Sequence, residues 1–145
     1  MAFVSITRLR LRALRFLPAF ALHTFRAQAQ LRRAPGFLDG ALLPDWRRTF
    51  WTMSIWDTPE SMRAYILNGA HKAAMPKLLN WCDEAALVHW DQPDTRLPSW
   101  QEADRRMRES GRTSKVRHPG PDHAAMTFAP PRVTLGGPIR PAKNR

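Results

Sequence analysis

The alternation of apolar and polar positions predicts a strand at Thr49–Trp56, in the middle of the chain. This run is rich in aromatic and β-branched residues, which strands favour. Side chains alternate between the two faces of a strand, so Phe50 and Trp56 share one face while Trp51 lies on the other. Both faces are therefore largely apolar, as they are in a second predicted strand at residues 85–90. Such a sheet needs cover on both sides, and we expect helices on one side and a partner subunit on the other.

Weaker patterns predict two more strands, at residues 3–9 and 37–44, and two long helical segments. The first helix starts at Pro18 and ends before the breaker sequence Ala34-Pro35-Gly36. Its most apolar positions share one face and are predicted to face the core: Leu22, Phe25 and Ala29.

The second helical segment has a clear beginning at Asp57-Thr58-Pro59-Glu60, which combines a polar cap, a first-turn proline and an early acid. Asn68-Gly69 interrupts this segment, which then resumes as far as Trp81. Pro76 is expected to kink it, because proline removes a backbone donor and crowds the preceding turn.

The predicted order of elements is strand–helix–strand–strand–helix–strand. This order defines an α+β, ferredoxin-like βαββαβ domain with an antiparallel sheet, which we assign to residues 1–110. A short helix at residues 99–108 follows the last strand. Residues 111–145 are rich in Pro, Gly and Arg, and we expect them to form a flexible, disordered tail whose deletion leaves the melting temperature almost unchanged.

Composition narrows the class of protein without identifying a function. The formal net charge is +11, but no nucleic-acid-binding motif or interleaved aromatic pattern accompanies it, so no specific nucleic-acid partner is expected. No apolar run approaches the length of about 18 residues that a membrane-spanning helix needs. The single cysteine, Cys82, excludes an internal disulfide, and we expect a cytoplasmic protein.

Several short motifs occur in the order in which a known family carries them. They are Phe50–Trp56, Met62–Tyr65, Gly69–His71, Met75-Pro76 and Trp81–Ala85. In these motifs the chain resembles an uncharacterised bacterial family of the dimeric α/β-barrel superfamily, related to the antibiotic-biosynthesis monooxygenases and more distantly to spheroidene monooxygenase. The resemblance extends over residues 3–108. It implies that two sheets face each other across a homodimer to form a dimeric α/β barrel, and it assigns no catalytic residue.

His71 is the predicted catalytic residue. It follows Gly69 at the start of a helical segment, where a residue without a side chain lets a ligand approach closely. A neutral imidazole suits a general base. The resemblance adds another role, since haem-handling members of the superfamily use a helix histidine as the iron ligand. A histidine that only hydrogen-bonds locally at a helix start explains the same residue without any function.

The predicted substrate-binding residues are mostly aromatic: Trp51, Trp56, Tyr65, Asn80, Trp81 and His89. Aromatic side chains line pockets for planar apolar ligands. Packing in the core or at a dimer interface explains the same aromatic residues equally simply. No grouping of cysteines, histidines and carboxylates in the sequence predicts a metal site.

These patterns favour a monooxygenase-like protein that acts on or binds a small, mostly apolar molecule in a pocket between helices and sheet. The first alternative is a non-catalytic, dimeric ligand-binding or stress protein of the same fold. The second is a haem-binding oxygenase, so haem is a possible cofactor although none is required. The sequence leaves open whether the protein is an enzyme, because one fold hosts many chemistries.

Overall fold

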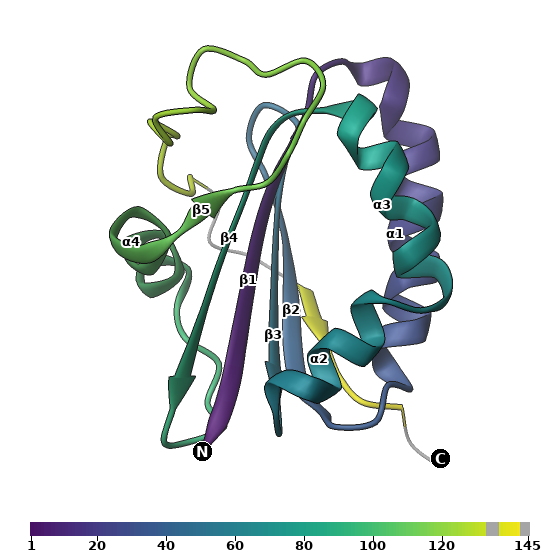
Figure 1. The fold of residues 1–145 in the computed structure, drawn as a ribbon, viewed down its shortest axis with the longest axis vertical. Coiled ribbons are helices and arrows are strands. Elements are labelled where there is room, and N and C mark those ends of the chain that lie inside the picture. Colours follow the sequence, from purple (N-terminus) through teal and green to yellow (C-terminus); the bar gives the residue numbers. More distant parts are fainter. Residues whose placement is uncertain (133–136, 143–145) are drawn as a thin grey trace.

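The chain forms an antiparallel sheet with three helices packed on one of its faces, as Figure 1 shows. The computed structural model describes residues 1–132 and 137–142. Within these residues the strands are β1 (Ala2–Leu11), β2 (Phe37–Asp45), β3 (Thr49–Trp56), β4 (Cys82–Gln92), β5 (Arg112–Thr113) and β6 (Gly137–Ile139). The helices are α1 (Leu17–Arg32), α2 (Pro59–Ile66), α3 (Gly69–Trp81) and α4 (Trp100–Ser110), with the short 3-10 turn η1 (Leu14–Phe16) before α1.

The strand order β5-β4-β1-β3-β2-β6 confirms the predicted α+β, ferredoxin-like fold class, with two short strands added at the edges. Every neighbouring pair is antiparallel. β1 lies at the centre and is paired along its whole length with β4 on one side, and over residues 3–10 with β3 on the other. This double pairing explains why β1 and β4 are longer than the predicted strands at residues 3–9 and 85–90.

The second helical segment divides at the predicted position. Thr58 caps α2, because its side chain accepts a hydrogen bond from the backbone N–H of Ser61 (3.2 Å). Gly69 separates α2 from α3 and has a φ of +58°, a conformation that favours glycine. Pro76 lies inside α3, and the helix continues past it to Trp81. The predicted kink at Pro76 therefore does not end the helix.

The predicted core-facing stripe of α1 is wrong. Leu22 is 48% exposed and Phe25 is 72% exposed, and Ala29 is exposed as well. The residues that α1 buries are Phe20 and Leu31, which lie eleven positions apart and therefore on one face. Apolar spacing does not mark the inward side of α1, because that side carries polar residues such as Thr24 and Gln28 in its middle.

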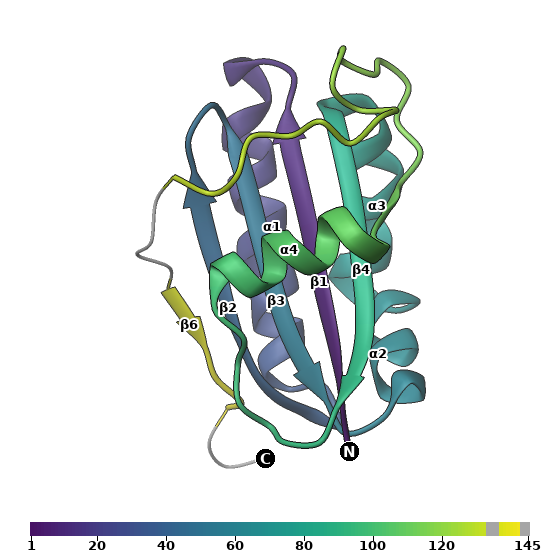
Figure 2. The same cartoon turned by 90° about the vertical axis from the view of Figure 1, so that its left-hand side faces the viewer.

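The opposite face of the sheet is covered by the same chain, which corrects the expectation that a partner subunit covers it. Figure 2 shows α4 lying across this face. Ala103 and Met107 of α4 are buried against the inner side chains of β1, β3 and β4, among them Val4, Met53 and Val88. The apolar second face of the sheet is therefore no argument for a partner subunit.

The segment after residue 110 also differs from the expected flexible tail wherever the structure describes it. β5 pairs with β4 and β6 pairs with β2. Phe128 is 6% exposed and belongs to the same core cluster as Met107, while Ile139 is 3% exposed and packs at the other sheet edge. A few well-spaced apolar residues are enough to dock a polar segment whose average composition resembles that of a linker.

Candidate functional site

The layer between the helices and the sheet has apolar clusters at its two ends. One cluster includes Leu31, Trp56 and Met62, and lies at the α2 end. The other includes Leu11, Phe20 and Cys82, at the end where α3 joins β4. The two clusters share no residue, so the middle of this layer is packed differently from its ends.

Four hydroxyl residues occupy the sheet face between these clusters: Ser5, Thr7, Thr52 and Ser54. They alternate along β1 and β3 with side chains that are buried on the opposite face, and so they point toward the helices. The strand register pairs Ser5 with Ser54 and Thr7 with Thr52. We call these four residues the hydroxyl patch.

The hydroxyl patch is short of hydrogen-bond partners. Ser54 accepts a hydrogen bond from Trp56 Nε1 (2.8 Å), whereas the hydroxyls of Ser5, Thr7 and Thr52 have no partner within the described part of the chain. Hydroxyls under a packed layer are normally hydrogen-bonded, because burying an unpaired one is costly. These groups are therefore available to a ligand or to water.

Three of the four patch residues keep partial solvent exposure although they lie on central strands beneath a helix layer, while Ser5 is 8% exposed. Thr7, Thr52 and Ser54 are only partly buried, whereas the residues that alternate with them on the opposite face, such as Ile6 and Met53, are almost fully buried. The inward side of α1 is also only partly buried and partly polar in its middle. Its residues between Phe20 and Leu31 include Thr24, Ala27 and Gln28.

Three of the predicted site residues form a continuous row of rings at the α2 end of this space. The ring of Trp56 on β3 lies 5.5 Å from that of Tyr65 on α2, and the Tyr65 ring lies 4.9 Å from that of His71 on α3. The Tyr65 hydroxyl donates a hydrogen bond to the backbone carbonyl of Ala27 in α1 (3.1 Å). The row thus runs from the sheet to the helix layer.

His71 is held in place by a residue that the sequence did not single out. The side chain of Gln30 accepts a hydrogen bond from the His71 backbone N–H (2.9 Å) and donates to the carbonyls of Tyr65 (3.0 Å) and Asn68 (2.8 Å). A Cβ at Gly69 would come within 3.1 Å of the Gln30 side chain. Gln30 therefore connects α1 to the α2–α3 junction and sets the start of α3.

The protonation states suit acceptance of a proton. Burial lowers the pKa of His71, against a smaller raising effect of a hydrogen bond with the backbone of Ile66, so the imidazole is neutral at neutral pH. Its Nδ1 is buried and has no partner among the residues described. Burial raises the pKa of Tyr65, which keeps the phenol protonated.

His89 lies on the same sheet face as the hydroxyl patch. It pairs with Ser5 in the β1–β4 register, and its ring lies 5.2 Å from that of Phe3. Burial is the main cause that lowers the pKa of His89, and the nearby charges of Arg112 and Arg63 lower it further. A second neutral imidazole therefore lies at the edge of the space.

The other predicted substrate-binding residues do not join this group. Trp51 is 1% exposed on the opposite sheet face, in the core cluster with Met107. Trp81 lies in the same layer but packs at the far end, with its ring 5.5 Å from that of His23. Asn80 accepts hydrogen bonds from Arg12 with its carbonyl (2.6 Å) and its side-chain oxygen (3.3 Å), which ties β1 to the end of α3.

The residues that sequence reasoning missed are small or polar: Ser5, Thr7, Thr52, Ser54 and Gln30. The alternation of hydroxyl and apolar residues in β1 and β3 is visible in the sequence as Ser5-Ile6-Thr7 and Thr52-Met53-Ser54. It reads there as an ordinary half-buried strand. Only the position of the helices shows that the polar side faces an interior layer.

Haem does not fit His71 in this arrangement. The unpartnered Nδ1 has almost no exposed surface and the Tyr65 ring lies beside the imidazole, so a macrocycle at that nitrogen would displace far more of the covering layer than a small planar ligand. Across residues 1–132 and 137–142, no group of three or more His, Cys, Asp or Glu side chains is arranged to hold a metal ion. In the same ranges no helix is both long enough and apolar enough to cross a membrane.

Comparison with solved structures supports the fold. SnoaB from Streptomyces nogalater, a cofactor-independent oxygenase, is 14% identical with a TM-score of 0.54, and the match covers 65% of this chain and 95% of SnoaB. A conserved protein from Methanosarcina mazei Go1 is 12% identical with a TM-score of 0.58, covering 64% and 94% of the two chains. An antibiotic biosynthesis monooxygenase is 13% identical with a TM-score of 0.57, covering 65% and 100%.

Identities this low show a common fold and leave the reaction open. No protein with a curated description matches the sequence significantly. A sequence family does match, over residues 19–135, and its description is "Domain of unknown function (DUF3291)". This match spans most of the chain, from the first turn of α1 to beyond α4, so the chain belongs to the DUF3291 family, whose fold here is that of the antibiotic-biosynthesis monooxygenases.

Proposed function

We propose that the chain binds a small, mostly apolar molecule with oxygen substituents between its helix layer and its sheet, and oxygenates it without a cofactor. The observation that carries this proposal is the hydroxyl patch. Three of its four hydroxyls lack partners within the described chain, three of its four residues are only partly buried, and apolar clusters flank it on both sides. Such a site suits a planar, oxygen-bearing ligand, whose rings contact the clusters while its oxygens bond to the hydroxyls.

His71 acts as the base in this proposal. Molecular oxygen reacts with an organic molecule without a cofactor only when that molecule supplies the electrons, which requires an electron-rich anion. An anthrone-type substrate loses a ring CH proton to His71 Nδ1, and the resulting carbanion adds oxygen to form a hydroperoxide that recovers the proton. The hydroperoxide then loses water and leaves a ketone, so one oxygen atom enters the product and the other leaves as water.

The surroundings of His71 support this role. Its imidazole is neutral because burial lowers its pKa, and Nδ1 has no competing partner among the described residues. In the unliganded chain this nitrogen is covered, so a substrate that reaches it displaces the covering side chains. His89, on the sheet, is proposed to contact the substrate from the other side.

One chain supplies every residue of this site. The proposed reaction therefore does not depend on the predicted homodimer, and the cytoplasmic location likewise stays a prediction. A non-catalytic ligand-binding protein remains the second candidate, because the hydroxyl patch binds oxygen-bearing ligands whether or not a base acts on them.

Oxygen uptake with dithranol, a hydroxylated anthrone, tests this proposal. We expect the purified protein to accelerate dithranol oxidation to the anthraquinone above the buffer rate. His71→Gln should reduce that acceleration at least about a hundredfold, since positioned general bases contribute roughly two to four orders of magnitude. The matched control is His118→Gln, an exposed histidine far from the site in sequence, which should leave the rate unchanged.

Each outcome decides between the candidates. Dithranol that binds to the protein without faster oxygen uptake identifies the non-catalytic ligand-binding protein. An oxidation rate that is equally high in His71→Gln and in the unmodified protein rules out His71 as the base. A Soret band that appears when haem is added and disappears in His71→Ala contradicts cofactor-free oxygenation.

A further inference from the structure

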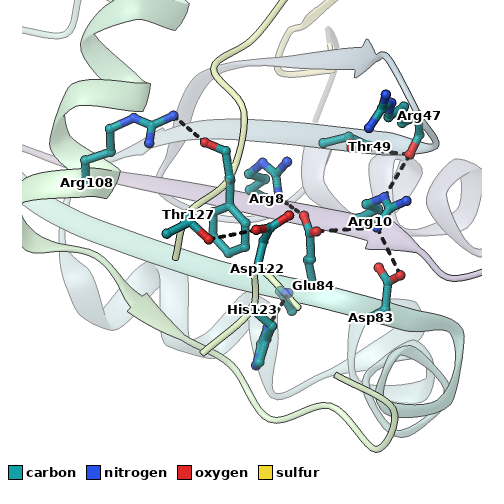
Figure 3. A network of polar contacts seen from close by, with 12 residues as sticks. Arg8, Arg10, Arg47, Thr49, Asp83, Glu84, Arg108, Asp122, His123 and Thr127 are labelled. Carbon is teal, nitrogen blue, oxygen red and sulfur yellow. Dashed lines mark hydrogen bonds and ion pairs between the residues drawn. The ribbon is translucent and has the colours of Figure 1, made fainter. Parts of the chain in front are cut away.

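A pocket lies on the sheet face opposite the hydroxyl patch and is unrelated to the proposed reaction. It opens between the turn that joins β2 to β3 and the C-terminal segment at residues 129–132. Four arginines contribute to its lining, together with Thr49 and Glu84: Arg8, Arg10, Arg47 and Arg132. We call it the arginine pocket, and Figure 3 shows its polar network.

The inner end of the arginine pocket holds a buried ion pair with unused donors. Arg8 and Glu84 are 4% and 3% exposed, and Arg8 Nη1 lies 2.6 Å from Glu84 Oε1. The second oxygen of Glu84 is taken by Arg10, at 3.4 Å, and Arg10 also contacts Asp83 at 3.1 Å. Arg8 Nε is buried without a hydrogen-bond partner among the described residues. A buried guanidinium with an unused N–H indicates a missing acceptor.

The outer end carries two further guanidiniums that share one aromatic ring. Arg47 and Arg132 lie 4.7 and 3.9 Å from the centroid of the Trp46 ring. Neither forms a salt bridge with any residue in the described ranges. Two cations on one indole repel each other. The carboxylate beside them in the lining is Asp45, which accepts a hydrogen bond from the backbone N–H of Arg132 (3.1 Å).

The backbone that presents Arg47 is held in an unusual conformation. Arg47 and Arg48 both have positive φ values, 56° and 60°, although neither is glycine. Contacts with β1 maintain this turn, because Arg10 Nε donates to the Arg47 carbonyl (3.3 Å) and Arg48 Nε donates to the Leu11 carbonyl (3.0 Å). Consecutive positive φ values are typical of tight hairpin turns, and this turn joins β2 to β3, so the hairpin fixes the position of Arg47 at the pocket.

The charges of the lining favour an anion. The carboxylates in the lining are Asp45, Glu84 and Asp122, against four guanidiniums. The two oxygens of Glu84 are already paired with Arg8 and Arg10, and Asp122 accepts a hydrogen bond from the hydroxyl of Thr127 (2.8 Å). A guanidinium presents its donors in a planar fork that matches the oxygens of phosphate and carboxylate groups.

We propose that the arginine pocket binds a small oxyanion, held by Arg47 and Arg132 at the mouth and by Arg8 at the buried end. The shared chemistry is that of a phosphate or carboxylate group, whether free or part of a small metabolite. The site lies on the sheet face opposite the hydroxyl patch. Anion binding and dithranol oxygenation can therefore be tested independently, and failure of one leaves the other unaffected.

Isothermal titration calorimetry tests this proposal with two probes, sodium phosphate and sodium acetate, at constant ionic strength set by sodium chloride. We expect saturable one-to-one binding of at least one probe, and the stronger probe identifies the group that the pocket prefers. Arg47→Gly removes a guanidinium without straining a backbone of positive φ, and Arg132→Gln removes the other. Each should weaken binding about tenfold or more, as expected for the loss of a charged hydrogen bond.

The matched control is Arg26→Gln, which removes the same charge from an exposed position on α1 and should leave the affinity unchanged. Absence of saturable binding by both probes would overturn the proposal. Equal weakening in Arg26→Gln and in the pocket variants would overturn it too, because the effect would then follow net charge. Binding of a single-stranded oligonucleotide that depends on Arg47 and Arg132, without binding of either small anion, would replace it with a nucleic-acid surface.

Discussion

At the scale of single residues, the middle of the helix–sheet layer is organised by polar groups rather than by the tryptophans. Gln30 uses its whole amide, with three hydrogen bonds to backbone groups around the start of α3. Its neighbour on the same helix, Gln28, is also partly buried and makes no side-chain hydrogen bond within the described residues. Substituting Gln30 and Gln28 in turn separates the stability that comes from these hydrogen bonds from the stability that comes from having a glutamine on α1.

We expect Gln30→Met to lower the free energy of unfolding by about 2 kcal/mol, since it leaves partly buried backbone groups of Tyr65 and His71, and the exposed carbonyl of Asn68, without their partner. Gln28→Met should change it by less than about 0.5 kcal/mol. Urea denaturation of both variants measures the difference. Equal free energies for the two would show that Gln30 does not hold the α2–α3 junction.

At the scale of elements, the sequence predicts strands and helix starts well, because local rules govern them. The alternation in Thr49–Trp56 and the cap at Thr58 are confirmed as β3 and as the start of α2. Which side of a helix packs toward the core is harder to predict. The inward side of α1 carries Thr24 and Gln28 between its apolar ends, so periodicity selected the exposed Leu22 and Phe25 instead.

The C-terminal segment shows the same limit, since no local pattern marks Phe128 as a core residue. Its ring lies 4.2 Å from the Arg8 guanidinium carbon, and its carbonyl accepts a hydrogen bond from Arg108 (2.6 Å). Both partners are distant in sequence and meet only in the fold. Two phenylalanines thus exchange the roles that sequence patterns assign to them: Phe25 is exposed and Phe128 is buried.

Phe128→Ala should therefore lower the free energy of unfolding by about 3 kcal/mol, the range for removing a buried aromatic ring. Phe25→Ala should change it by less than about 0.5 kcal/mol, because its ring is 72% exposed. Thermal and urea denaturation of the two variants provide the comparison. A larger loss of stability in Phe25→Ala than in Phe128→Ala would contradict this account and favour a core-facing Phe25 and a flexible tail.

At the scale of the whole molecule, the two faces of the sheet have different roles. Helices α1 to α3 cover the face that carries the hydroxyl patch, while α4 lies across the apolar face (Figures 1 and 2). Asp122 and residues 129–132 of the C-terminal segment line the arginine pocket on that face. The chain thus closes the sheet face for which a partner subunit was expected. The predicted homodimer therefore no longer follows from the apolar character of this face.

The central claim is that the space between helices and sheet is the ligand site. A crystal structure of the protein with the dihydroxyanthraquinone formed from dithranol tests it most directly. We predict density for the ring system between the two apolar clusters, with its oxygens within hydrogen-bonding distance of the hydroxyls of Ser5, Thr7 or Thr52 and its edge beside His71. Density for the ring system anywhere else, with the hydroxyl patch unoccupied at a saturating concentration, would contradict the account.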